Sequence, residues 1–193
     1  MKRLCVFTGA SPGARPQYAR AAQDLAEALV ERNLTLIYGG SKVGLMGLLA
    51  DAALEAGGEV IGVIPERLFA KEIPHMGLTE LHMVKSMHER KQVMADLSDG
   101  FLALPGGVGT LEELTEIYTW GQLGLHRKPC GLFNVEGYYN YLIQFLDHAV
   151  HERFLKPTHR DTLLVGDDPG ELLDKFANYR APRLGKWLDR AST

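Results

Sequence analysis

Short apolar runs alternate with longer amphipathic segments along most of the chain, and this alternation restricts the fold more than any other feature. The apolar runs are nearly continuous, which is typical of parallel strands that are buried on both faces. A strand followed by a helix, repeated several times, predicts a parallel sheet with helices on both faces. We therefore predict an α/β fold, as a single Rossmann-like domain with a doubly wound, mostly parallel sheet. The strands are expected at 3–8, 34–40, 59–65, 79–84, 100–104, 128–134 and 161–166.

Helices are expected between these strands, where apolar residues recur every three or four positions. Pro16 suits the first turn of one helix, and Gly57 and Gly58 are a stop signal for the next. Residues 1–180 are expected to form one domain, and 181–193 a loosely ordered tail. The helices are expected at 16–33, 44–58, 86–99, 110–125, 138–154 and 168–179.

The composition is that of an ordinary globular protein, since 46% of the 193 residues are hydrophobic and 23% are charged. The net charge of −3 gives no electrostatic basis for binding nucleic acid or an anionic membrane. No apolar run approaches the roughly 18 residues of a membrane span, and the run Leu4–Phe7 is too short for a signal peptide. We expect a cytoplasmic protein with no nucleic-acid or membrane partner.

Cysteine and histidine usage gives no sign of a metal site or a disulfide. Cys5 and Cys130 both lie in apolar runs, which favours small core residues over a disulfide or a nucleophile and fits a reducing cytoplasm. The seven histidines form no HExxH motif and no Cys/His cluster, and His148 and His151 lack a carboxylate that would complete a site. We therefore expect no protein-bound metal.

Three glycine-rich loops follow predicted strands and precede predicted helices: FTGASPG at 7–13, YGGSKVG at 38–44 and LPGGVG at 104–109. In open parallel sheets, ligands bind at the carboxyl edge of the strands, where these loops lie. Glycine lets backbone N–H groups approach a ligand closely, and a helix N-terminus favours an anion. One such loop could be a tight turn and nothing more. Three in a protein without a basic surface predict a phosphorylated small molecule.

The phosphorylated ligand is predicted to be a mononucleotide or a sugar phosphate. A dinucleotide fits badly, because no GxGxxG follows the first strand, and the second ends in Tyr38-Gly39-Gly40 where an acidic residue would bind the ribose. The stretch GGSKVG is not a P-loop either, because no Gly-Lys-Ser/Thr closes it.

The helix predicted at 86–99 places a positive charge on its apolar face. Arg90 shares this face with Met87, Met94 and Leu97. An inward charge is costly unless it is paired or lies at the edge of a pocket. Arg90 either extends its guanidinium to the surface or places it in the ligand crevice, where Lys91 could help to bind a phosphate.

Two readings also apply to Thr110 and Glu113, which follow the third glycine loop. The pattern T-x-x-E is a capping box, in which Thr110 would be the N-cap and Glu113 would reach back to it. Alternatively, Glu113 lies at the ligand edge near helix-terminal N–H groups, which favour its ionised form. A carboxylate there is suited to act as a base or to stabilise a cation.

The stretches MHERK (87–91), PGGVGTLEE (105–113) and YGGSKVGLMG (38–47) together closely resemble the LONELY GUY (LOG) family. The resemblance runs from about residue 3 to 180. It implies a Rossmann-like fold, a homodimer or larger assembly, and no organic cofactor. The implied activity is hydrolysis of the N-glycosidic bond of a purine (cytokinin-type or adenine) nucleoside 5′-monophosphate, which gives free base and ribose 5-phosphate.

The resemblance also implies roles for individual residues. Arg90 and Glu113 match the catalytic pair, and the family often has a third glycine where this chain has Ser41. Gly106, Gly107, Gly109 and Thr110 would hold the phosphate. The implied substrate-binding residues are Gly9, Ser11, Gly40, Gly44, Met46, Glu72, Lys91, Pro105, Gly106, Gly107, Val108, Gly109, Thr110, Leu111, Glu112 and Thr119.

Two other functions compete with hydrolysis as interpretations of this sequence. The family has long been labelled "lysine decarboxylase", but a pyridoxal-phosphate enzyme needs a Schiff-base lysine, and Lys42 and Lys91 lie in motifs better explained by phosphate. A non-catalytic nucleotide or cofactor carrier on the same fold is the remaining alternative. The presence of both Arg90 and Glu113 favours the enzyme. The preferred base, whether adenine, an N6-prenylated adenine or another purine, stays open.

The helix predicted at 110–125 suggests an assembly. One side carries apolar residues, but Trp120 and Leu123 lie outside that stripe. A helix that is apolar on a second side must bury it somewhere, and in a one-domain protein a second subunit is a natural partner. We expect a homodimer with the active site near the interface; alternatively, Trp120 packs under a neighbouring loop. The expected stripe is Leu111, Leu114, Ile117, Tyr118 and Leu125.

Overall fold

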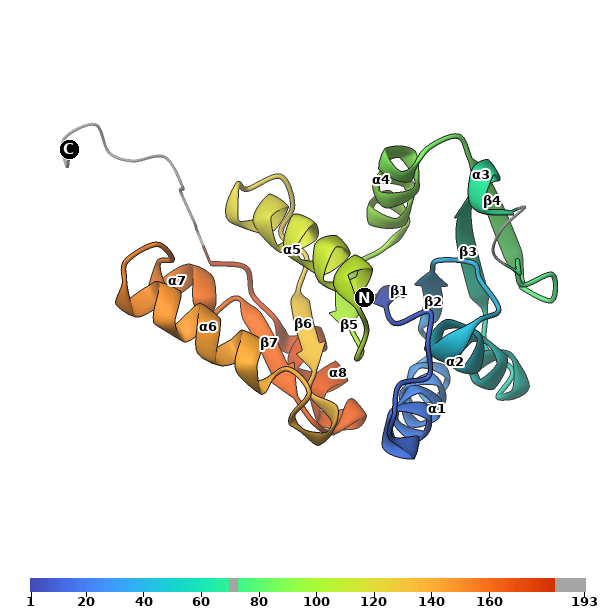
Figure 1. Cartoon of the computed structure of the whole chain (residues 1–193), viewed down its shortest axis with the longest axis horizontal. Coiled ribbons are helices and arrows are strands. Elements are labelled where there is room, and N and C mark those ends of the chain that lie inside the picture. Colours follow the sequence, from blue (N-terminus) through green and yellow to red (C-terminus); the bar gives the residue numbers. More distant parts are fainter. Residues whose placement is uncertain (70–72, 183–193) are drawn as a thin grey trace.

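The computed structural model describes residues 1–69 and 73–182 and confirms the predicted α/β class. The seven strands in these residues form one parallel sheet with helices on both faces (Figure 1). The strands are β1 Arg3–Phe7, β2 Thr35–Tyr38, β3 Val60–Pro65, β4 Glu80–Val84, β5 Gly100–Ala103, β6 Cys130–Phe133 and β7 Leu163–Gly166.

Every predicted helix is present, usually shorter by one to three residues at an end. Three short helices, α3, η1 and α7, were not predicted, and the predicted tail lies outside the described residues from 183 onward. No helix in the described part of the chain is long and apolar enough to cross a membrane. The helices are α1 Pro16–Glu31, α2 Gly44–Glu55, α3 Glu66–Phe69, α4 Met87–Leu97, α5 Val108–Gln122, η1 Val135–Gly137, α6 Asn140–His151, α7 Pro157–Arg160 and α8 Pro169–Asn178.

The boundaries of α5 differ from prediction at both ends. The helix begins at Val108, two residues early, and ends at Gln122 rather than at 125. Gly124 closes it in the left-handed conformation, with φ of 79°, which glycine adopts without strain. Leu125 therefore lies beyond the helix and is 69% exposed, so its predicted place on the apolar stripe was wrong.

Alternate residues of each strand pack into two separate cores. In β1, Leu4 and Val6 face one core, which α1, α2 and α8 cover. Cys5 and Phe7 face the other core, which α4, α5 and α6 cover (Figure 1). This alternation follows from the two-residue period of a strand, and the helices on both faces explain why the strands are apolar throughout.

The order of the strands places a ligand crevice at the centre of the sheet. The order is β4-β3-β2-β1-β5-β6-β7, so the chain runs outward from β1 and then returns to β5 beside it. The helix after β1 covers one face and the helix after β5 covers the other, so the two connecting loops diverge. In open parallel sheets this switch point is where ligands bind.

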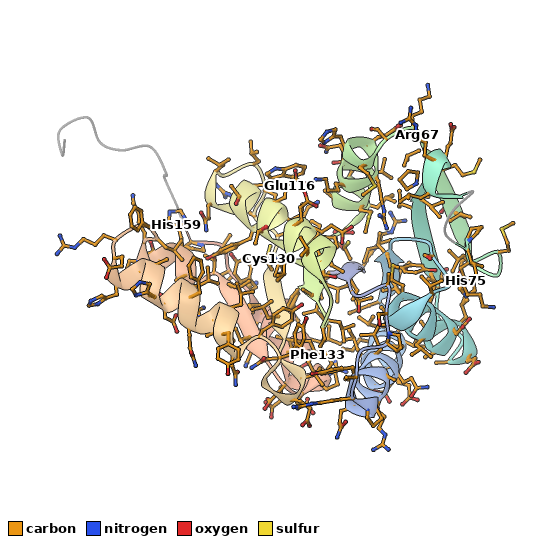
Figure 2. The ribbon with its side chains drawn as sticks, in the orientation of Figure 1. Arg67, His75, Glu116, Cys130, Phe133 and His159 are labelled. Carbon is orange, nitrogen blue, oxygen red and sulfur yellow. The ribbon has the colours of Figure 1, made fainter. Side chains whose placement is uncertain are left out.

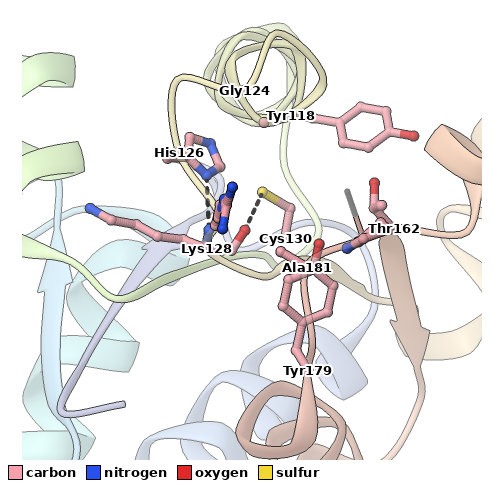
Figure 3. A pocket seen from close by; sticks show the side chains of 11 residues that line it. Tyr118, Gly124, His126, Lys128, Cys130, Thr162, Tyr179 and Ala181 are labelled. Carbon is pink, nitrogen blue, oxygen red and sulfur yellow. Dashed lines mark hydrogen bonds between the residues drawn. The ribbon is translucent and has the colours of Figure 1, made fainter. Parts of the chain in front are cut away.

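Both cysteines are free and buried in strands, as predicted. Burial raises the pKa of the Cys130 thiol to about 12 and that of the Cys5 thiol well above its usual range. Cys130 lines a cavity of about 370 Å³ together with Tyr118 and Tyr179 (Figure 3). Because Cys130 is the first residue of β6, this cavity lies at the edge of the sheet opposite the glycine loops.

We expect the native protein to resist thiol labelling. At pH 8, a disulfide-exchange reagent should modify neither cysteine on a timescale of minutes, because the reactive thiolate is scarce at both sites and the sulfur atoms are buried. The same reagent in denaturant should modify both. Rapid labelling of the native protein would mean that the cavity beside Cys130 admits the reagent.

Candidate active site

The three glycine loops lie against one another at the carboxyl edge of the sheet. The Gly9 amide and the Thr8 hydroxyl both donate hydrogen bonds to the Pro105 carbonyl, each at 3.2 Å. These bonds join the first loop to the third. The amide of Leu45, which directly follows the second loop, donates to the Gly9 carbonyl at 3.1 Å and holds the end of that loop against the first. The sheet thus brings together segments that are far apart in the sequence.

Two glycines in this cluster are required by close packing. A Cβ atom on Gly44, whose φ is 58°, would collide with the Ala10 backbone, and a Cβ on Gly106 would collide with Thr110. Gly107 and Gly109 are different, because a Cβ atom on either would meet nothing within 4 Å. The first pair lets the loops pack together, and the second pair faces open space at the start of α5.

A cavity of about 470 Å³ lies between the first and third loops, at the switch point of the sheet. Five of the predicted ligand-binding residues are found in its wall. Tyr18, Leu45 and Tyr138 also line it, and they were not predicted from the sequence. The predicted residues in the wall are Gly9, Ser11, Pro105, Gly106 and Gly107.

The start of α5 rules out the capping box. The N-cap is Gly107, which has no side chain, so Thr110 and Glu113 both lie within the helix. Thr110 is 3% exposed, whereas Val108 is 84% exposed. The first N–H groups of a helix have no intrahelical acceptor. Without a capping side chain from Gly107, those of α5 are suited to an anionic ligand.

Arg90 is buried near these loops, with 7% of its surface exposed. Its Nε donates to the Val63 carbonyl and its Nη2 to the Gly39 carbonyl, both at 3.1 Å. The guanidinium is therefore fixed rather than extended to the surface, which excludes the alternative reading of Arg90. Met87 was expected on the same inward face, but it is the first residue of α4 and is 42% exposed.

Glu113 faces the same guanidinium from α5. Its Oε1 lies 3.9 Å from Nη1 of Arg90, and its side chain is 13% exposed. The ion pair joins α4 to α5 on one face of the sheet (Figure 1). A largely buried carboxylate, held by an arginine and partly open to solvent, is suited to stabilise a cation or to orient a water molecule.

Gly39 makes room for this arrangement. A Cβ atom on Gly39 would collide with Nη2 of Arg90. The sulfur of Met46, which is a core residue of α2, closes the same space. The glycine at the end of β2, where a dinucleotide-binding fold would have an acidic residue, is thus explained by the arginine.

Lys91 is engaged by two carboxylates of α5. Its Nζ lies 2.6 Å from Oε1 of Glu112 and 2.9 Å from Oε2 of Glu116 (Figure 2 labels Glu116). Partial burial lowers the pKa of Lys91, but the hydrogen bonds and charges of the two glutamates outweigh burial and raise it overall. To bind a phosphate, the ammonium would have to exchange at least one of these partners.

A short segment after the undescribed residues pairs with the second glycine loop. The His75 amide donates to the Gly40 carbonyl at 3.0 Å, and the Lys42 amide donates to the Ile73 carbonyl at 2.8 Å. The His75 ring, which is labelled in Figure 2, is anchored by Asp51, with 2.8 Å between Nε2 and Oδ1. The Ser41 hydroxyl also donates to the Ile73 carbonyl, which adds a hydrogen bond between this segment and the second glycine loop.

The remaining predicted residues are placed as follows. Glu72 lies outside the described residues. Leu111 packs half-buried against the core under α5. Thr119 lies about three turns beyond the start of α5. Its hydroxyl donates a hydrogen bond to the Thr115 carbonyl at 2.7 Å. Thr119 is thus remote from the cavity between the loops of its own protomer.

Solved structures with a similar fold include carrier proteins. The molybdenum cofactor carrier protein of Chlamydomonas reinhardtii matches with a TM-score of 0.68 and 19% identity, over 90% of this chain and 94% of that one. The molybdenum cofactor binding protein of Rippkaea orientalis matches with a TM-score of 0.66 and the same identity, over 90% and 94%. At this identity the likeness shows the fold alone.

Comparison of the sequence with known proteins identifies the family, which structural similarity does not. The family model described as "Possible lysine decarboxylase" matches residues 46–176. The cytokinin riboside 5′-monophosphate phosphoribohydrolase LOG5 of Arabidopsis thaliana is 52% identical over 179 residues, which are 93% of this chain and 78% of the relative. LOG1 of the same plant is 49% identical over 191 residues, which are 99% and 89%. The chain therefore belongs to the LOG family, which the family model describes as possible lysine decarboxylases.

Proposed function

We propose that this protein hydrolyses the N-glycosidic bond of a purine nucleoside 5′-monophosphate of the cytokinin type, releasing the free base and ribose 5-phosphate. The observation that carries the proposal is the Arg90–Glu113 pair, which is fixed beside the glycine loops. Relatives at about half identity, such as LOG5 and LOG1, are named for this activity.

The proposed reaction passes through a transition state with positive charge on the ribose ring. As the bond to the base breaks, positive charge builds at the ribose, and the Glu113 carboxylate stabilises it. A water molecule supplies the new oxygen at the sugar carbon, and its proton balances the charge of the departing base. Arg90 keeps the carboxylate in place, and the burial of both groups strengthens their interaction with the substrate.

The phosphate is proposed to bind at the start of α5. Gly106, Gly107, Gly109 and Thr110 surround the first turn, whose N–H groups are suited to an anion. The open space over Gly107 and Gly109 is where the phosphate would lie. Binding energy from the phosphate positions the ribose without taking part in bond cleavage.

A carrier function is the weaker alternative. The carrier proteins of similar fold support it only at the level of architecture. A carrier has no need for a carboxylate held by a buried arginine at its binding site. Binding of nucleotide without any turnover by the native protein would favour the carrier.

We also propose that the protein is a cytoplasmic homodimer with its active site near the interface. Trp120 packs partly against the core of its own subunit, so it does not form the second, exposed apolar side of α5 that was expected. Leu123 and Leu125 are exposed at 48% and 69% and remain candidates for the interface. Thr119 lies on the same helix, so a partner subunit is where it could meet substrate. The two free thiols fit a reducing compartment.

Glu113→Gln should abolish hydrolysis while leaving the fold and nucleotide binding intact. We expect kcat for AMP and isopentenyladenosine monophosphate to fall by about 100-fold or more, since the uncharged amide cannot stabilise the ribose cation. Turnover is measured as free base and ribose 5-phosphate, and binding by calorimetry. Glu116→Gln, on the same helix, is the matched control and should keep most of its turnover. Near-normal turnover of Glu113→Gln would contradict the proposed role.

Gly39→Ala should impair the enzyme through Arg90. The added methyl group would displace Nη2 from the Gly39 carbonyl, and we expect kcat to fall by about 10-fold or more, the loss of one hydrogen bond to a charged group. In a background that already carries Arg90→Ala, the same change should cost little, because the space is vacant. Equal losses in both backgrounds would show that Gly39 acts independently of Arg90.

Leu123→Asp should weaken the proposed dimer. We expect light scattering on dilution to give a dimer for the native protein and a monomer for the variant, because an interface core disfavours a charge. Activity should fall with the mass. A native protein that is monomeric and fully active would refute the shared-pocket arrangement.

A further inference from the structure

The turn after β6 delivers two tyrosines onto the third glycine loop. The Tyr139 hydroxyl donates to the Leu104 carbonyl, and the Tyr138 hydroxyl donates to the Gly106 carbonyl. Two consecutive residues thus hold the carbonyls on either side of Pro105. Nothing in the local sequence of the loop indicates these partners.

The turn is strained and pinned in place. Glu136 has φ of 52°, and Gly137 follows with φ of 70°. A non-glycine residue in the left-handed region is costly and persists where the surroundings enforce it. Asn134 does so here, since its side-chain Oδ1 accepts a hydrogen bond from the Tyr139 backbone N–H at 2.7 Å, and its backbone N–H donates to the Gly166 carbonyl at 2.7 Å.

The two tyrosines differ in their surroundings. Tyr139 is a core residue with 2% of its surface exposed. Tyr138 is 41% exposed, and it lines the cavity between the glycine loops together with Tyr18. The rings of Tyr138 and Tyr18 meet edge to face, with centroids 5.7 Å apart. The hydroxyl of Tyr138 therefore acts at the wall of the cavity rather than in the core.

The hydrogen bond to Gly106 controls the next amide group. The carbonyl of Gly106 and the N–H of Gly107 belong to one planar trans peptide unit, so they point in opposite directions. A peptide between two glycines turns over easily because neither neighbour has a Cβ atom. Gly106 cannot be replaced by a stiffer residue, because a Cβ there would collide with Thr110. The rigidity of this peptide has to come from outside the loop.

We propose that Tyr138 is a positioning residue for the phosphate: by holding the Gly106 carbonyl, it aims the Gly107 N–H and the start of α5 at the ligand. This inference rests on the proposed function, because it assigns the phosphate to the open space at the start of α5. The ring of Tyr138, with that of Tyr18, forms part of the wall of the cavity between the first and third loops. The residue acts on binding through the loop and takes no part in bond cleavage.

Tyr138→Phe tests the proposal, because it removes the hydroxyl and keeps the ring. We expect the affinity for ribose 5-phosphate, measured by calorimetry, to fall by about 3- to 10-fold, the worth of one hydrogen bond. KM for AMP should rise by a similar factor with kcat nearly unchanged. The affinity for adenine alone should not change, because the free base has no phosphate for the Gly107 N–H to bind.

Tyr141→Phe is the matched control, since Tyr141 is on α6 in the same region and is 84% exposed. It should bind ribose 5-phosphate as the native protein does. Unchanged affinity of Tyr138→Phe for ribose 5-phosphate, or an equal loss in Tyr141→Phe, would overturn the proposal. So would a native protein that does not bind ribose 5-phosphate. The calorimetry does not depend on turnover, so the two proposals can fail separately. A protein that binds ribose 5-phosphate but hydrolyses no nucleotide would refute the proposed function. The role of Tyr138 would still be decided by the affinities of the native protein and of Tyr138→Phe for ribose 5-phosphate.

Discussion

The buried guanidinium of Arg90 is the constraint on which the site depends. Removing a charge from water is costly unless hydrogen bonds and an opposite charge replace the solvent. Two carbonyls and Glu113 do so here, and they come from the residue after β2, from within β3 and from α5. One side chain thereby fixes the relative positions of two strands and two helices. The absence of a side chain at Gly39 follows from the same requirement.

The glycines around the site have two separate physical roles. At Gly44 and Gly106, a side chain would collide with a neighbouring loop, so these residues let the loops pack into one layer. At Gly107 and Gly109, no protein atom excludes a side chain, and the space is open. A glycine required by packing and a glycine facing open space look the same in a sequence. The structure separates the residues that build the layer from those over which a ligand can lie.

The fold could be predicted because its signals are local. Apolar runs, helical periodicity and glycine stops located all seven strands, and parallel pairing brought the three loops to one edge. The inward position of Arg90 was likewise readable from its spacing to Met94. The capping box failed because Gly107, which has no side chain, takes the N-cap position three residues before Thr110. Local pattern alone could not decide between two possible starts of α5.

Contacts between segments that are distant in the chain could not be predicted from the sequence. The pairing of Lys91 with Glu112 and Glu116 depends on how α4 and α5 lie on the sheet. Tyr18 and Tyr138 reach the cavity from α1 and from a turn whose backbone conformation is strained. These side chains become neighbours through the tertiary fold, and no spacing rule connects them.

The central position of β1 has a consequence for biosynthesis. β1 pairs with β2, which follows it closely, but its other partner is β5, about half a chain later. While the chain emerges from the ribosome, the first four strands can assemble, yet one side of β1 offers unpaired N–H and C=O groups between apolar side chains. Such an edge is a template for strands of other nascent chains. The same strand order that opens the ligand crevice therefore leaves the growing chain most exposed to aggregation until residues 100–103 are made.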